Sequence, residues 1–307
     1  MLYLQNFFCF LLFFFTLTTS AQEVRATLDK LTGKSWFSGA KNCLVDQSPS
    51  FESFQYNKNT FILRQNKCDH YEAPFIYLLF GEKRALLIDS GATADKKKRS
   101  LAKKVEEIML QRAKQLKLTA KTMPLLLAHS HSHSDHIAGD IQFTDFTNIE
   151  IIQANDTKSL LKAFSFEDWP TKNSVINLGE RIISVIPTPG HQAQAISFYD
   201  HQSTLLFTGD SIYPGRLYIR KWYDYKDSIQ RLVTFTESHP VAGLLGAHIE
   251  MSDSPNNDYP VESTYQPNEA SLVLTIDDLK KLNRNLIKLG DKPKLTSLGN
   301  MIIYPIE

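Results

Sequence analysis

Hydrophobic residues recur along the chain in short runs that are separated by turn-forming residues. Runs rich in aromatic and β-branched residues predict strands at 54–56, 60–63 and 75–80, because Asn, Gly and Lys break the pattern between them. The runs at 85–88 and 125–128 are apolar without alternation, which predicts strands that are buried on both faces.

Other segments have the period of a helix. Residues 94–118 place Leu101, Val105, Ile108 and Leu116 on one stripe, which predicts an amphipathic helix led by a solvated basic run at 96–99. Further strands are expected at 149–153, 175–178, 182–186, 195–199, 205–208, 241–246 and 301–304, and helices at 156–164, 228–238 and 269–289. No internal repeat or linker interrupts this order, so we expect residues 22–307 to form a single α/β (α+β) domain.

The first 21 residues contain no charged side chain, and Phe and Leu dominate positions 7–17. Small residues follow at Thr19, Ser20 and Ala21, where a signal peptidase would cut. This layout predicts a signal peptide at 1–21 and an exported protein, periplasmic or secreted, with no membrane segment after cleavage. Because the usual basic start is missing, an uncleaved membrane anchor is the alternative.

The composition is that of a globular protein able to bury a sizeable core, with 42% hydrophobic and 22% charged residues. The formal net charge is +1, which argues against a nucleic-acid partner held by phosphate attraction. Cys43 and Cys68 are the cysteines that remain after removal of residues 1–21. In an oxidising compartment we expect them to form a disulfide, and a metal-ligand role for Cys68 is the alternative.

The chemistry concentrates after the strand at 125–128, where four histidines and one aspartate fall within residues 129–136. Alternate residues of an extended segment point the same way, so His131 and His133 can share one target. Asp135 and His136, where the chain turns toward a helix, can face a point beside it. Imidazole and carboxylate groups are ligands for zinc and related ions. The alternative is a solvated loop that is rich in histidine.

The same arrangement, in which a strand is followed by a small residue and a metal-type ligand, recurs along the chain. It occurs at Asp89, His191, Asp210 and His248 as well as at the histidine cluster. Because α/β proteins build their sites at strand ends, we expect these side chains to meet.

The pattern His131-x-His133-x-Asp135-His136, followed by His191, Asp210 and His248, resembles that of the metallo-β-lactamase-fold superfamily. The strand end at 87–91 resembles the early Asp-x-Gly motif of that superfamily, and the turns at 189–191 and 207–210 match it as well. The resemblance covers about residues 60–248 and indicates almost nothing about the substrate.

The resemblance implies a four-layer αββα sandwich with metal ions at one edge of its two sheets. It implies that His131, His133 and His191 hold a first ion, that Asp135, His136 and His248 hold a second, and that Asp210 bridges both. Two divalent ions are therefore expected, zinc in the first place, with iron or manganese as alternatives. With a bridging Asp210, the pattern resembles that of glyoxalase II-type thioesterases, lactonases and phosphodiesterases more than that of true β-lactamases.

Several further residues have two interpretations each. Asp89 is expected to orient a ligand histidine, with a plain turn-capping role as the alternative. Asp135 and Tyr213 are the catalytic candidates; Tyr213 resembles the tyrosine of acyl-homoserine lactonases, and core or rim packing is its alternative. We expect His129 to be a packed or hydrogen-bonded neighbour rather than a ligand. Surface positions are expected for His70, His201, His239, Arg216, Arg220 and Lys221. For the three Arg and Lys residues, contact with an anionic substrate group is the alternative.

The resulting hypothesis is a metal-dependent hydrolase that uses a metal-bridging hydroxide on an ester, lactone, thioester or amide of a small-molecule substrate. The alternatives are an oxidoreductase resembling mononuclear iron persulfide dioxygenases, which uses only the first site, and a β-lactam hydrolase. A metal-binding protein without activity is disfavoured because no ligand of the pattern is missing.

Overall fold

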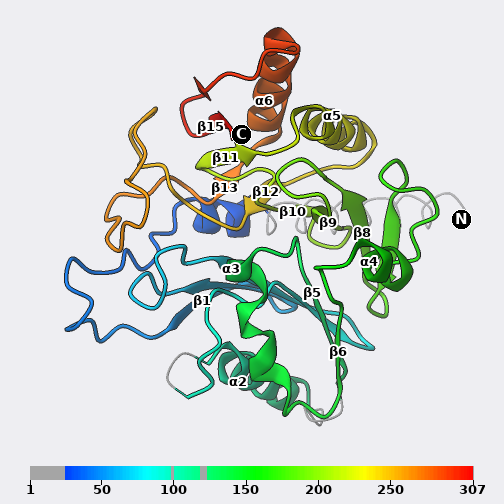
Figure 1. The fold of residues 1–307 in the computed structure, drawn as a ribbon. Coiled ribbons are helices and arrows are strands. Elements are labelled where there is room, and N and C mark those ends of the chain that lie inside the picture. Colours follow the sequence, from blue (N-terminus) through cyan, green and yellow to red (C-terminus); the bar gives the residue numbers. More distant parts are fainter. Residues whose placement is uncertain (1–24, 98–99, 118–122, 307) are drawn as a thin grey trace, which may run out of the picture.

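The computed structural model describes residues 25–97, 100–117 and 123–306, so the predicted signal peptide at 1–21 lies outside the described part of the chain. Two six-stranded sheets face each other in these residues (Figure 1). The first has the order β1-β2-β3-β4-β5-β6 and is formed by Phe51–Asn57, Thr60–Gln65, Phe75–Phe80, Ala85–Ile88, Leu125–Ala128 and Ile149–Ile151. The second has the order β13-β12-β10-β9-β8-β7 and is formed by Val273–Leu274, Gly243–Gly246, Leu205–Gly209, Ile196–Asp200, Ile182–Pro187 and Ser174–Asn177.

Helices cover the outer face of each sheet, as the αββα arrangement requires. In Figure 1 helix α2 (Leu101–Leu116) lies below the first sheet, and α5 (Trp222–Ser238) and α6 (Ile276–Leu289) lie above the second. The shorter helices are α3 (Ser134–Ile137), the 3-10 helix η2 (Ala138–Phe143) and α4 (Thr157–Ala163). A small third sheet has the order β11-β15-β14 and is formed by Arg216–Ile219, Ile302–Pro305 and Thr296–Ser297.

The packing explains why the central strands lack polar alternation. In β4, Leu86 and Ile88 belong to the apolar cluster between the two sheets, whereas Leu87 belongs to the cluster between the first sheet and α2. In β10, likewise, Phe207 packs between the sheets and Leu206 packs toward α5 and α6. Both faces of these strands are therefore buried, and the predicted four-layer sandwich is confirmed.

Two of the predicted helices begin later than expected. The helix predicted at 94–118 starts at Leu101, because the Ser100 side chain accepts a hydrogen bond from the Lys103 amide and caps it. The helix predicted at 269–289 starts at Ile276, because Thr275 and Asp278 form a capping box. The helix predicted at 228–238 starts earlier, at Trp222.

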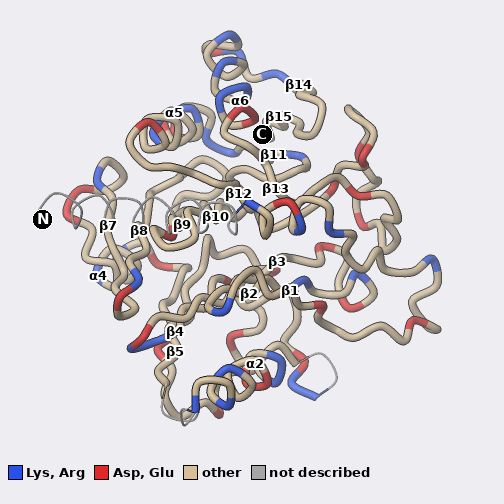
Figure 2. Tube along the Cα trace, turned by 180° about the vertical axis from the view of Figure 1, so that it is seen from behind, with Lys and Arg blue, Asp and Glu red and all other residues tan. Residues whose placement is uncertain are grey.

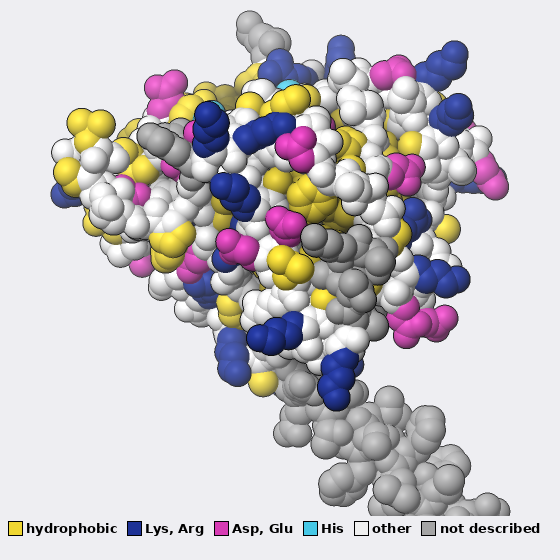
Figure 3. Space-filling view, turned by 90° about the horizontal axis from the view of Figure 1, so that it is seen from below, with side chains coloured by type: hydrophobic (Ala, Val, Ile, Leu, Met, Phe, Trp, Pro, Cys, Tyr) yellow, Lys and Arg dark blue, Asp and Glu magenta, His cyan; other side chains and the backbone are white. Residues whose placement is uncertain are grey.

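Cys43 and Cys68 form a disulfide with a Cα–Cα distance of 5.1 Å, as predicted. Lysine and arginine positions are intermixed with aspartate and glutamate positions over the back of the molecule (Figure 2). The face seen from below also carries charged side chains of both signs among apolar ones (Figure 3). Among the described residues, no helix combines the length and the apolar character that crossing a membrane requires.

Candidate metal centre

The strand directions bring the predicted strand-end residues to one edge of the two sheets. Strands β4 and β5 are parallel, so Asp89 and the histidine cluster leave the first sheet at the same edge. In the second sheet β10 and β12 are parallel, and β8 runs in their direction because β9 is antiparallel to both β8 and β10. His191, Asp210 and His248 therefore follow strands that end at a common edge, and they meet the histidine cluster there.

A first group of possible ligands consists of His131, His133, His191 and Asp210. The ring nitrogens converge: His133 Nδ1 lies 2.9 Å from His131 Nε2 and 3.0 Å from His191 Nε2. Asp210 Oδ2 lies 3.8 Å from His131 Nε2 and 3.5 Å from His191 Nε2. Three nitrogens and one oxygen thus surround one point, which is the number and kind of ligands that zinc takes in proteins.

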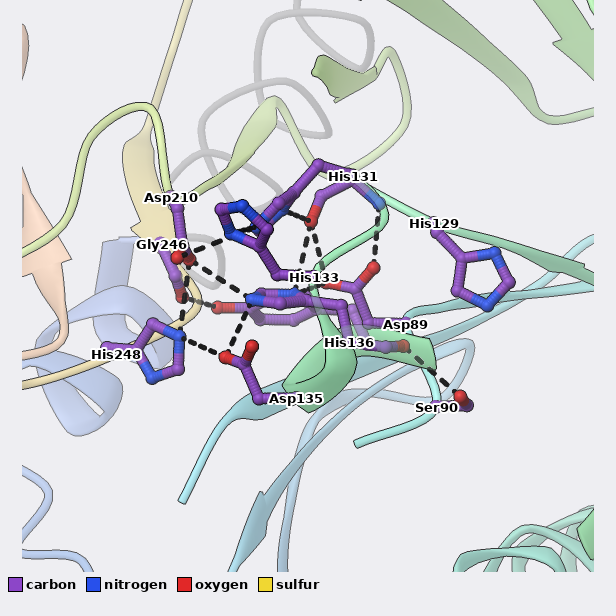
Figure 4. A network of polar contacts seen from close by, with 12 residues as sticks. Asp89, Ser90, His129, His131, His133, Asp135, His136, Asp210, Gly246 and His248 are labelled. Carbon is purple, nitrogen blue, oxygen red and sulfur yellow. Dashed lines mark hydrogen bonds and ion pairs between the residues drawn. The ribbon is translucent and has the colours of Figure 1, made fainter. Parts of the chain in front are cut away.

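A second group consists of Asp135, His136, His248 and again Asp210 (Figure 4). Asp135 Oδ2 lies 3.1 Å from His136 Nε2 and 3.2 Å from His248 Nε2. Asp210 Oδ1 lies 3.4 Å from His136 Nε2 and 3.3 Å from His248 Nε2. The two oxygens of Asp210 therefore face different groups, Oδ2 the first and Oδ1 the second.

Hydrogen bonds on the far side of three rings fix which nitrogen faces the centre. The Nδ1–H groups of His191 and His248 donate to the carbonyl oxygens of Tyr218 and Glu72, at 2.8 and 3.0 Å. His136 Nδ1 lies 2.8 Å from Asp89 Oδ2. Because a neutral imidazole has one N–H, a ring that donates through Nδ1 keeps a lone pair on Nε2, as a metal ligand must.

Asp89 makes the contact with a histidine of the cluster that its predicted orienting role requires. Besides His136, it accepts hydrogen bonds from the amide and the hydroxyl of Ser130, at 2.7 and 2.9 Å. Its backbone lies in the left-handed region, with φ at 67°, which is unusual for a residue other than glycine. Strained positions of this kind are found at functional sites where the surrounding contacts fix them, as the Ser130 and His136 contacts do here.

The donor set fits metal ions on evidence other than its sequence pattern. His136 Nε2 and Asp210 Oδ1 are buried and make no hydrogen bond of acceptable geometry, although buried polar atoms normally have a partner. Within each group the ligand atoms lie within 4.8 Å of one another. A cation in the second group would supply the missing partner to both of these atoms.

The two groups differ in their electrostatics before an ion binds. Burial lowers the pKa of His131, His133 and His191, and neighbouring histidines add to this effect. For His136 and His248 burial acts in the same direction, but Asp135 and Asp210 outweigh it and hold both pKa values well above the ordinary one. Before an ion binds, the protonated form is therefore disfavoured for the histidines of the first group and favoured for those of the second.

The structure gives Tyr213 a partner other than a substrate. Its side chain is buried, and its hydroxyl donates to the carbonyl oxygen of Arg216. Its ring packs against His248 at a centroid distance of 5.6 Å. A tyrosine hydroxyl has only one hydrogen to donate, so this geometry favours the packing alternative, and the oxyanion role stays a prediction.

Arg216 is not the surface charge that was expected. It is 6% exposed and contacts two carboxylates, those of Glu250 and Asp258. Its Nε–H donates to the Tyr218 hydroxyl at 2.9 Å. These partners lie up to 42 positions away in the sequence, so no local pattern indicated that the side chain turns inward. Arg220 and Lys221 are exposed, as predicted.

The other histidines do not belong to either ligand group. His129 is buried and hydrogen-bonded, as predicted, with its ring directed away from the cluster (Figure 4). His201 is exposed as expected, whereas His70 and His239 are partly buried.

A cavity of about 350 Å³ opens onto both groups. Besides five of the ligands, its lining consists of Glu72, Tyr213, Tyr218, Arg220, Glu250 and Ile306. The sequence did not point to Glu72 or Tyr218, because each orients a ligand through its backbone carbonyl, for which no residue type is diagnostic.

Comparison with known proteins agrees with this geometry. The model of the family described as "Metallo-beta-lactamase superfamily" matches residues 72–239, more than half of the chain. The chain is 27% identical over 204 residues to the acyl-coenzyme A thioesterase MBLAC2 of Bos taurus, covering 56% of this chain and 72% of that protein. It is 28% identical over 112 residues to a hydroxyacylglutathione hydrolase of Mesorhizobium japonicum, covering 36% of this chain and 43% of that protein.

Among solved structures, TMB-1 aligns with a TM-score of 0.52 at 13% identity, over 80% of this chain and all of that one. At this identity the likeness concerns the fold alone. The family match extends over the strand ends that carry the histidine cluster, His191 and Asp210. The chain belongs to the metallo-β-lactamase superfamily.

Proposed function

We propose that this protein is a hydrolase that holds two divalent metal ions, zinc in the first place, and cleaves an acyl bond of a small molecule. The observation that carries the proposal is the position of Asp210, whose two oxygens face two separate ligand groups. A single-ion oxygenase would need only the first group, and the second would then have no role.

The chain's own residues prepare the site for this chemistry. His131, His133 and His191 would hold the first ion, Asp135, His136 and His248 the second, and Asp210 would be shared. When bound, such a pair of ions supplies an activated water and positive charge for the developing oxyanion. Asp89 and the carbonyl oxygens of Glu72 and Tyr218 keep the ligand rings oriented.

Thioesters are the substrates we would test first. Two relatives of the chain are named for thioester hydrolysis, an acyl-coenzyme A thioesterase and a hydroxyacylglutathione hydrolase. In the reaction the oxygen of water bonds to the acyl carbon, the carbon–sulfur bond breaks, and the sulfur leaves as a thiol with one proton. Esters and lactones, in which the leaving atom is oxygen, follow the same scheme.

We also propose that the protein is exported, because the apolar, uncharged residues 1–21 end in small residues. The disulfide between Cys43 and Cys68 supports this proposal, since such bonds persist in oxidising compartments. N-terminal sequencing should find a mature protein that starts at or near Gln22. An intact Met1 on protein from the cytoplasm would contradict export.

The test of function compares the metal-loaded full chain with the same protein after chelation. Acyl thioesters, lactones, β-lactams and phosphodiesters are offered in parallel, and oxygen uptake is recorded with a persulfide. We expect hydrolysis of a thioester or another acyl substrate that chelation abolishes and zinc restores. Oxygen consumption with one iron per chain and no hydrolysis would overturn the proposal in favour of the oxygenase.

A further inference from the structure

We infer that the pair formed by the buried His129 and the partly buried Asp140 positions the turn that carries Asp135 and His136, and thereby sets the affinity of the second metal group. The inference rests on the proposed two-ion centre. It concerns residues that are not ligands, and it makes them positioning residues rather than catalytic ones.

The ligand-bearing turn has little support of its own. Helix α3 is four residues long, and its N-cap residue, His133, makes no side-chain capping bond. The helix runs directly into η2, which also lacks a side-chain cap. A helix this short is not stable in isolation, so the place of Asp135 and His136 depends on contacts with the rest of the fold.

His129 and Asp140 provide such a contact. The His129 side chain is fully buried, and its two ring nitrogens lie 3.0 Å from the Ile152 carbonyl oxygen and 2.8 Å from Asp140 Oδ1. His129 follows β5, Ile152 follows β6, and Asp140 belongs to η2. The ring therefore joins the ends of two strands of the first sheet to the helix that continues α3.

Ser90 connects the pair to His136. Its hydroxyl lies 2.7 Å from Asp140 Oδ1 and 3.1 Å from the His136 carbonyl oxygen, to which the Ser90 amide also donates, at 2.8 Å. The contact is close, because a Cβ on Gly139 would lie 2.0 Å from the Ser90 carbonyl oxygen. Asp89 thus contacts the His136 ring, Ser90 contacts the His136 backbone, and Asp140 contacts Ser90.

The roles of donors and acceptors suggest how to break the contact selectively. As a carboxylate, Asp140 only accepts, and both Ser90 and His129 lie within hydrogen-bond distance of the same oxygen. An asparagine can take its place, because an amide N–H can donate to His129 Nε2 while Ser90 donates to the His136 carbonyl. An alanine cannot. Since the Asp140 side chain is 24% exposed, water can reach the gap, and we expect Asp140→Ala to fold.

The experiment titrates the metal-free full chain with zinc by calorimetry for the wild type, Asp140→Ala and Asp140→Asn. His248→Ala, which removes a ligand of the second group only, assigns the two binding steps. We expect Asp140→Ala to weaken the second step about 10–100-fold and the first by less than about threefold, in the range known for residues behind metal ligands. Asp140→Asn should stay within about threefold of the wild type at both steps.

Asp145→Ala is the matched control, because Asp145 lies just beyond η2 and its side chain is 85% exposed. It should leave both steps unchanged. Unchanged binding in Asp140→Ala, equal weakening of both steps together with a lower Tm of the metal-free protein, or no rescue by Asp140→Asn would each overturn the inference. A wild type that takes up fewer than two ions would overturn the proposed function and the inference with it, whereas two ions in the wild type separate the two claims.

Discussion

At the scale of single residues, the two metal groups differ in the protons that they carry. His131, His133 and His191 have lowered pKa values, so at neutral pH these rings are already free to bind an ion. His136 and His248 have raised pKa values because Asp135 and Asp210 face them, and an ion must displace their protons.

The difference predicts that the two ions bind with different pH dependence. As the pH rises, fewer protons compete for His136 and His248, so the affinity for the second ion should increase, by about tenfold per pH unit for each proton released. The affinity for the first ion should change little around pH 7. Calorimetry between about pH 6 and 8, in buffers with different ionisation heats, counts the protons. Proton release with the first ion instead of the second would contradict the assignment.

Tyr213→Phe distinguishes packing from a role in the reaction. Removal of the hydroxyl leaves the Arg216 carbonyl oxygen without its donor, so we expect a loss of about 1–3 kcal/mol in the free energy of unfolding. Both ions should be retained, and the hydrolytic rate should fall by no more than about threefold if the packing alternative holds. A loss of about 10²–10³-fold in turnover would instead show that the hydroxyl serves the oxyanion.

Whether the role of a single residue could be predicted from the sequence depended on the kind of contact that the residue makes. The histidine cluster, Asp210 and His248 were predictable, because each follows an apolar strand and each is itself a metal-type ligand. The assignment of these residues to two ligand groups came from the family resemblance. Glu72 and Tyr218 were not predictable, because their backbone carbonyls do the orienting.

At the scale of elements, we expect the second ligand group to depend on how closely α3 and η2 approach the turn after β4. Gly139 permits this approach, because a Cβ there would lie 2.0 Å from the Ser90 carbonyl oxygen and 3.0 Å from its carbon. Both are backbone atoms, so no change of rotamer relieves the contact.

Gly139→Ala is therefore expected to move the turn and lower the free energy of unfolding by about 1–3 kcal/mol. The second ion should bind more weakly, because Asp135 and His136 move with α3. Urea unfolding and zinc titration measure the two effects. Gly33→Ala is the control, since the nearest atom to its Cβ would be 3.5 Å away. If Gly139→Ala matched Gly33→Ala in both measurements, the close approach would not matter to the site.

The order of the elements was predictable, but the starts of some helices were not. Apolar periodicity predicted the positions of α2, α5 and α6, whereas the first residues of α2 and α6 depend on caps. Residues 94–99 precede the Ser100 cap in the sequence, and residues 269–274 precede Thr275 and include β13. Apolar periodicity alone does not mark where the backbone turns helical, because the cap sets the first residue.

At the scale of the whole molecule, the disulfide ties a segment before β1 to the loop after β2. Cys43 and Cys68 are 25 positions apart, and closing a loop of that length stabilises the fold by about 3 kcal/mol in the chain-entropy model. The double variant Cys43→Ser/Cys68→Ser should lose about this amount in urea unfolding. It should still bind two ions, because neither cysteine belongs to a ligand group. Two thiols titrated in the denatured, non-reduced wild type would rule the disulfide out.

The central claim, that two ions share Asp210 and together support hydrolysis, is tested most directly by zinc titration with ion counting and a thioester assay on each sample. The wild type should bind two ions per chain and reach full rate only with the second. Asp210→Asn should bind about one ion and lose most of its rate, because a neutral amide offsets the repulsion between two cations less well. Asp227→Asn, at an exposed position of α5, should behave as the wild type. Two ions and a near-normal rate in Asp210→Asn would contradict the claim.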